Sequence, residues 1–85
     1  MPEISRFLGI VIYMYYRDHA PPHFHAIYGD YEAVIYLNDG VVEGKFPRRA
    51  LKAVVEWYEE HADELVDNWI LAKKGEPLKK VEPLE

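Results

Sequence analysis

Cysteine, glutamine and threonine are all absent from this sequence of 85 residues. The lack of cysteine excludes disulfide bonds, thiolate metal ligands and a cysteine nucleophile. No apolar run approaches the ~20 residues that a membrane-spanning helix needs. The first residues, MPEISRFLG, also lack the cationic segment and long apolar stretch of a signal peptide. We therefore expect a cytoplasmic protein with no membrane segment.

Positive charge is scarce as well. The 10 Lys and Arg residues face 15 Asp and Glu residues, which gives a formal net charge of -5. Because phosphate neutralisation supplies most of the nonspecific affinity for nucleic acids, this charge disfavours general DNA or RNA binding unless a local basic patch reverses it. The charged residues are mainly Glu and Lys, a bias that is typical of hyperthermophile proteins and predicts a thermophilic source.

The remaining composition is that of a folded protein. About half of the residues, 49%, are hydrophobic and 29% are charged. A chain of this length supports one modest core, so we expect a single domain over residues 1–85. So small a core would gain from dimerisation or from a partner chain, and the seven tyrosines favour such an interface.

The first half of the chain predicts an antiparallel meander of four strands, over residues 7–16, 23–28, 31–37 and 41–46. Gly29-Asp30 and Asp39-Gly40 are the expected tight turns. If both are two-residue turns, one face of the sheet forms the core with Phe24, Ala26, Tyr28, Tyr31, Ala33, Ile35, Leu37, Val42, Gly44 and Phe46. The other face then carries His23, His25, Ile27, Glu32, Val34, Tyr36, Glu43 and Lys45.

The second half predicts helix. Apolar residues recur at steps of three and four from Leu51 to Ala72, after a proline at position 47 that suits a helix start. The stripe fits one long helix or two, over about 48–61 and 63–74. We favour two helices, because one of roughly 27 residues, about 40 Å long, would overhang so small a sheet. Asp63 is the expected cap of the second helix.

Packing follows from the same stripe. His61 and Trp69 lie on this stripe, where the helices would pack on one face of the sheet, and Trp57 is also expected in the core, because tryptophan is more often a core residue than a ligand platform. Gly75 and Pro77 end the helical region, and an extended tail follows that we expect to be docked by Leu78, Val81 and Leu84. The predicted fold class is therefore α+β.

Three of the four histidines fall within seven positions, in the stretch RDHAPPHFHAIYG of residues 17–29. His23 and His25 would point to the same side of a strand about 7 Å apart, so both rings can converge on one metal ion. His19 or Asp18 in the preceding loop, or Glu32 across the hairpin, would supply a third ligand. A divalent ion such as zinc, nickel or iron suits these donors. Alternatively, the histidines only decorate an exposed strand and loop.

The same residues also fit acid–base cleavage of RNA. Imidazoles near neutrality can donate and accept protons, so His23 and His25 would be acid and base, with Tyr36 orienting them. The local basic patch consists of Lys45, Arg48, Arg49 and Lys52 and would hold an anion or a nucleic acid. Alternatively, nearby acidic residues neutralise this patch within the fold.

Several segments together resemble a known family: ISRFLGIVIYMYYRDHAPPHFHAIYGDYEAVI, PRRALKAVVEW, ELVDNW and PLKKVEPL. They are similar to small prokaryotic proteins of the domain of unknown function 4160 family (DUF4160), over nearly the whole chain. The resemblance implies a place in a two-gene module, whose partner resembles the domain of unknown function 2442 family. Such pairs look like toxin–antitoxin operons. The resemblance supplies no catalytic residues.

Two functions remain open from the sequence. The first is a toxin-like component of a two-gene module that acts on RNA through the histidines. The second is a protein-interaction or metal-binding module without catalysis. The sequence itself leaves open whether the protein is an enzyme.

Overall fold

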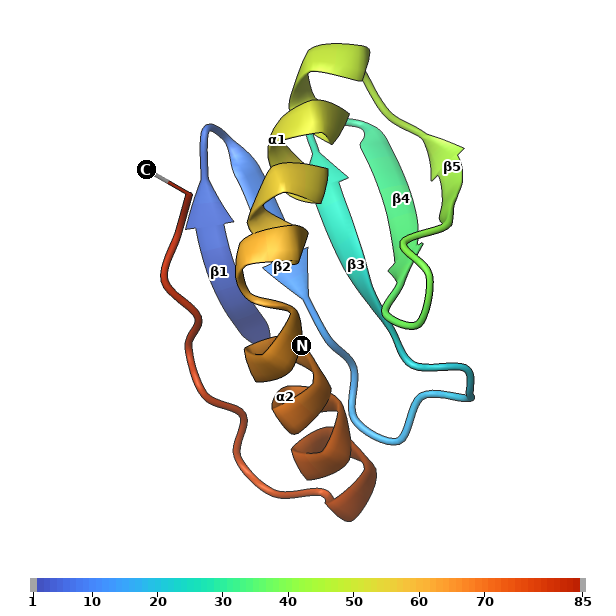
Figure 1. The fold of residues 1–85 in the computed structure, drawn as a ribbon, viewed down its shortest axis with the longest axis vertical. Helices are drawn as coiled ribbons and strands as arrows, with labels where there is room; N and C mark the ends of the chain where they lie inside the picture. Colours follow the sequence, from blue (N-terminus) through green and yellow to red (C-terminus); the bar gives the residue numbers. More distant parts are fainter. Residues whose placement is uncertain (1, 85) are drawn as a thin grey trace.

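An antiparallel sheet of five strands forms one layer, and two helices cover one of its faces (Figure 1). The computed structural model describes residues 2–84. The strands lie side by side in sequence order: β1 (Glu3–Phe7), β2 (Ile10–Tyr13), β3 (His23–Tyr28), β4 (Tyr31–Tyr36) and β5 (Val42–Lys45). Helices α1 (Arg48–Glu60) and α2 (Ala62–Lys74) follow. The predicted α+β class is confirmed, with five strands in place of four.

The predicted first strand, over residues 7–16, is wrong in its bounds. A turn interrupts it, β2 ends at Tyr13, and β1 begins before it at Glu3. Leu8 and Gly9 connect β1 to β2 with φ values of 53° and 78°. Two consecutive positive φ values belong to a tight hairpin turn. The usual first residue of such a turn is Asn or Asp, so the leucine hid the turn inside an otherwise strand-like run.

The predicted pairing of the central hairpin is confirmed. Tyr28 pairs with Tyr31 and Phe24 with Ile35, across a turn at Gly29 and Asp30. The next turn is longer than predicted: Val42 pairs with Ile35, not with Leu37. The backbone N–H of Gly40 donates to the Tyr36 carbonyl (2.9 Å), and the Asp39 carboxylate accepts from the Val41 N–H (3.1 Å). The shift is of two residues, so each side chain keeps its predicted face.

The core lies between the helices and the covered face of the sheet. Phe24 and Ile35 are fully buried there, and the Trp57 ring of α1 lies 5.6 Å from the Phe24 ring. Gly44, predicted for the core, is exposed on the edge strand β5. Two further residues predicted for the core, Tyr28 and Tyr31, are 37% and 47% exposed. They flank the hairpin turn at the end of the sheet, where the helices give little cover.

The helical stripe divides at His61, which confirms two helices. The His61 backbone N–H donates to the Trp57 carbonyl (3.0 Å) at the end of α1, and His61 also occupies the N-cap position of α2. The predicted cap, Asp63, lies in the first turn of α2, so that prediction is wrong by two positions. An acidic residue in a first turn still complements the helix dipole.

The C-terminal tail runs along the outer side of β1 (Figure 1). The Val81 N–H donates to the Ile4 carbonyl (2.8 Å), and the Trp57 indole N–H donates to the Glu82 carbonyl (2.8 Å). Val81 is buried, and Leu78 and Leu84 pack against the core, as predicted.

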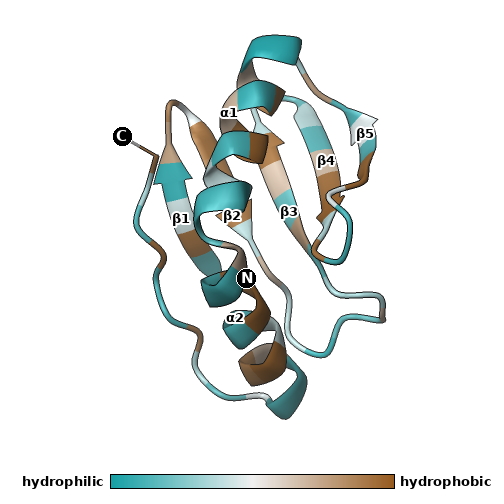
Figure 2. Ribbon diagram, viewed as in Figure 1, coloured by the Kyte–Doolittle hydropathy of each residue, from teal (hydrophilic) through white to brown (hydrophobic). Residues whose placement is uncertain are grey.

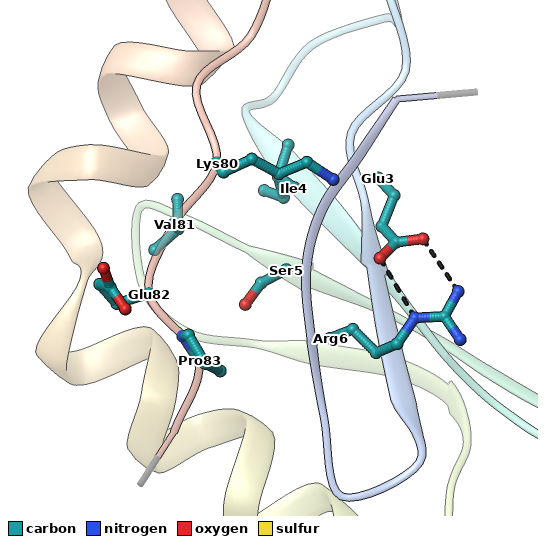
Figure 3. Close-up of a pocket in the computed structure, with 8 residues that line it drawn as sticks. All are labelled: Glu3, Ile4, Ser5, Arg6, Lys80, Val81, Glu82 and Pro83. Atoms are coloured by element: carbon teal, nitrogen blue, oxygen red, sulfur yellow. Dashed lines mark hydrogen bonds and ion pairs between the residues drawn. The ribbon is translucent and has the colours of Figure 1, made fainter.

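Residues of β1 and of the tail line a pocket of about 280 Å³. In Figure 3 the Ser5 side chain lies in this space, between the strand and Glu82 and Pro83 of the tail. The Ser5 hydroxyl is buried and has no hydrogen-bond partner among residues 2–84. The Glu3 carboxylate and the Arg6 guanidinium form an ion pair (3.0 Å) on the other side of the strand.

Hydrophilic and hydrophobic residues alternate along both helices (Figure 2). Within the part of the chain that the structure describes, neither helix is long and apolar enough to cross a membrane.

Candidate metal site

The loop between β2 and β3 carries the first acidic residue of the site, Asp18. Its backbone is attached to the end of α2 at two points. The Arg17 N–H donates to the Ala72 carbonyl (3.2 Å), and the Lys73 ammonium donates to the Asp18 carbonyl (3.1 Å). Asp18 is therefore held in place by the last helix, far from it in the sequence.

The side chains of Asp18, His23 and His25 converge on one point. One Asp18 carboxylate oxygen, Oδ2, lies 2.8 Å from His23 Nε2 and 3.3 Å from His25 Nε2. One donor atom from each of the three residues lies within 4.8 Å of the other two. His23 is buried, and the side chains of His25 and Asp18 are only 14% and 16% exposed. The cluster therefore offers two nitrogens and one oxygen in a largely enclosed place.

The other ring nitrogen of each histidine also faces an acceptor. His23 Nδ1 lies 2.7 Å from the Pro21 carbonyl oxygen, and His25 Nδ1 lies 3.2 Å from the Glu32 carboxylate. Because these oxygens can only accept, Nδ1 of each ring donates. A backbone carbonyl and a carboxylate are the usual partners that orient metal-binding histidines. Both Nε2 atoms are thereby directed at Asp18.

Aromatic rings pack against the two imidazoles. The Trp69 ring of α2 lies 5.2 Å from the His23 ring, and the Tyr15 ring lies edge-on to His25 at 4.4 Å. Tyr13 stacks on Tyr15 (6.4 Å) and extends this wall. The rings restrict the rotamers of both histidines, so the site is preorganised.

Opposing effects act on the pKa of Asp18. Burial raises it, but hydrogen bonds from His23, His25 and the His19 backbone outweigh burial, so the pKa lies below its ordinary value. The carboxylate is therefore ionised at neutral pH, which is the form that binds a metal ion. Burial, followed by the nearby Glu32 charge, raises the pKa of Tyr15, so this phenol stays neutral.

The structure separates the predicted metal ligands into different roles. His23 and His25 lie in the cluster. Glu32 contacts the far side of the His25 ring and so orients that ring. His19 lies outside the cluster, with a side chain that is 91% exposed and an Nδ1 atom 3.2 Å from the second Asp18 oxygen.

Tyr36, predicted to assist catalysis, lies beside the cluster with its ring 5.8 Å from the His23 ring. Its hydroxyl points elsewhere and donates to the Glu43 carboxylate (2.9 Å). This hydrogen bond raises the pKa of Tyr36. The phenol is therefore a neutral neighbour of the histidines whose proton is already engaged.

The basic residues are not brought to the histidines as a group. In the register of β4 and β5, Lys45 lies opposite Glu32, so its side chain is on the same face of the sheet as His25. Arg48, Arg49 and Lys52 belong to the first turns of α1, at the opposite end of the sheet from the loop that carries Asp18 (Figure 1).

The sequence pointed to Asp18 only as one of three possible third ligands. It gave no indication of the Pro21 carbonyl or of the Tyr15 and Trp69 rings. One signal for Asp18 was its position just before the Pro21-Pro22 pair, which has a histidine on each side. The contacts with α2 that fix Asp18 cannot be recognised in the neighbouring sequence.

Fold and site together define a small α+β domain with a cluster of two histidines and one carboxylate. Residues 9–70 match the family described as Domain of unknown function (DUF4160). The chain belongs to this family, as the resemblance indicated, and the matched segment includes all three donors of the cluster. No curated protein and no solved structure matches the chain.

Proposed function

We propose that the protein binds a divalent transition metal ion through Asp18, His23 and His25. The observation that carries the proposal is the pairing of both nitrogens of each ring with acceptors. A neutral imidazole has one N–H. All four contacts are therefore favourable only if each ring is a cation, or if a metal ion takes the place of the protons between the Nε2 atoms and Asp18.

The donor atoms limit which metal ions the site can bind. Two imidazole nitrogens and one carboxylate oxygen suit zinc, iron, nickel or cobalt, whereas magnesium and calcium prefer oxygen ligands alone. Three protein donors are one fewer than a closed structural zinc site has, so a coordination position remains for water or for a group from another molecule. The proposed function is thus an open metal centre.

The direct test is metal binding by protein freed of metal with a chelator. We expect one Zn²⁺, Ni²⁺ or Co²⁺ ion per chain in isothermal titration calorimetry. At a free metal concentration 100-fold above Kd, binding contributes about 2.7 kcal/mol of stability. For a domain of this size the melting temperature then rises by roughly 10 °C or more.

Variants locate the ion. Asp18→Asn and His25→Ala should lose most of the affinity and of the thermal shift. His61→Ala is the matched control, because His61 is as enclosed as His25 and also contacts a carboxylate, that of Glu64. Absence of stoichiometric binding, or equal binding by wild type and both cluster variants, would show that the proposal is wrong.

A toxin-like role in a two-gene module, with action on RNA, stays a prediction that rests on the resemblance described from the sequence. The basic residues in the first turns of α1 lie far from the histidines, so the geometry does not further support action on RNA. The cytoplasmic location, the thermophilic source and a partner of the domain of unknown function 2442 family also stay predictions.

A further inference from the structure

The outer side of α1 has an unusual distribution of charge. Its first turn contains Arg48 and Arg49 and no acidic residue, and its last turn contains Glu59 and Glu60 and no basic residue. Positive charge at a helix N-terminus and negative charge at its C-terminus both oppose the helix dipole. An interaction with oppositely charged groups at both ends would offset this cost.

No such interaction occurs within the described chain. Among residues 2–84, no ion pair involves the charged side chains of α1. No other described element lies over the outer side of α1 (Figure 1). The charges that oppose the dipole are therefore available to another molecule.

A shallow groove follows the same side of the helix. It is lined by Arg48, Leu51, Lys52, Val55, Glu56 and Glu59. At 100° per residue these six side chains form one stripe, with its apolar members in the middle, basic members toward the start and acidic members toward the end. Leu51 and Val55 are half-buried and give the groove its apolar character.

We propose that this stripe is the interface of a homodimer in which two α1 helices pack antiparallel. A twofold axis at the middle of the stripe, between positions 53 and 54, brings the basic end of each helix to the acidic end of the other. Arg48 and Glu59 lie about 8 Å on either side of that midpoint. Arg48 of each copy therefore lies next to Glu59 of the other copy.

The same axis matches the remaining residues. Leu51 lies beside Val55 of the second copy on one flank of the seam, and Lys52 lies beside Glu56 on the other. A self-complementary stripe of this kind specifies a second copy of this chain. A purely anionic partner would face repulsion from Glu56 and Glu59 at the far end.

The test is a charge-swap experiment on metal-free protein, read by analytical ultracentrifugation. An interface from one helix lies at the weak end of the size range, so concentrations should reach about 0.5 mM at low salt. Wild type should dimerise reversibly, and the dimer should weaken with added salt. Arg48→Glu alone and Glu59→Arg alone should each raise the dissociation constant at least about tenfold, because like charges then meet twice per dimer.

Mixing supplies the decisive readout. The Arg48→Glu and Glu59→Arg chains, each weakened alone, have complementary charges at both contacts and should form a heterodimer with nearly wild-type affinity. Circular dichroism checks that both variants are folded. A monomer at every concentration, a dimer indifferent to both reversals, or variants that fail to pair when mixed would each overturn the proposal. Binding of an anionic partner to a protein that stays monomeric would overturn it too.

Discussion

At the scale of single residues, two hydrogen bonds decide how the candidate site is built. The Pro21 carbonyl and the Glu32 carboxylate each accept from an Nδ1 atom, so the Nε2 atoms of His23 and His25 are directed at Asp18. Glu32 is the one of these two acceptors that a substitution can remove without altering the backbone.

We expect Glu32→Ala to lower metal affinity about 10–100-fold, because loss of an orienting partner typically has this effect. Glu32→Gln keeps an oxygen acceptor without the charge and should lower affinity less. Calorimetric titration of both variants with Zn²⁺ measures the difference.

Glu43→Ala provides the control, since Glu43 lies on the same face but accepts from Tyr36 and not from a histidine. If Glu32→Ala and Glu43→Ala bind the ion equally well, Glu32 does not orient His25.

At the scale of elements, the pairing of β4 with β5 depends on the absence of a side chain at Gly44. Its φ is 107°, and a Cβ there would lie 2.5 Å from the Glu32 carbonyl oxygen. We expect Gly44→Ala to lower the free energy of unfolding by about 1–3 kcal/mol, because both the backbone conformation and the contact are unfavourable. Urea denaturation measures the loss.

Gly29→Ala separates the cost of the backbone conformation from the cost of the contact with the Glu32 carbonyl. Gly29 also has a positive φ, 59°, but no atom lies within 4 Å of its Cβ position. The cost there should be only that of a left-handed residue, about 1 kcal/mol. Equal losses at the two glycines would mean that the contact with Glu32 contributes nothing.

At the scale of the whole molecule, Asn68 joins the last helix to the C-terminal tail. It is almost fully buried, its side-chain N–H donates to the Lys79 carbonyl (2.8 Å), and its side-chain oxygen accepts from the Lys79 N–H (2.9 Å). We expect Asn68→Ala to lower the free energy of unfolding by about 1–3 kcal/mol, since two part-buried hydrogen bonds to the tail backbone are lost. Hydrogen exchange should show faster exchange in the tail.

Asp67→Ala is the neighbouring control, because Asp67 is exposed on the same helix. Unchanged exchange in the tail of the Asn68→Ala protein would show that the contacts of Val81 and Glu82 hold the tail without Asn68.

Local chemistry made much of this architecture predictable. The Gly29-Asp30 turn fixes the register of the central hairpin, so alternation alone placed His23 and His25 together with Glu32 and Tyr36. The period of the helical stripe and the limit on its length predicted two helices. In both cases the deciding residues lie within one element or one turn of each other.

What could not be predicted depends on contacts between distant parts of the chain. The Tyr28 ring of β3 packs against the turn at Leu8 and Gly9. A Cβ atom at Gly9 would lie only 3.3 Å from that ring. The burial of His23 requires Trp69 from α2. The choice of Asp18 over His19 as third donor depends on the attachment of its loop to Ala72 and Lys73.

That attachment sets the order in which the site is completed. Asp18 and Lys73 are 55 positions apart, so during synthesis the carboxylate and both imidazoles emerge long before the helix that fixes the loop. A stalled or truncated chain that ends before α2 would carry all three donors without the contacts to Ala72 and Lys73 that fix the Asp18 loop. Full-affinity binding of the proposed metal ion would then require the finished chain and would be a late step in its maturation.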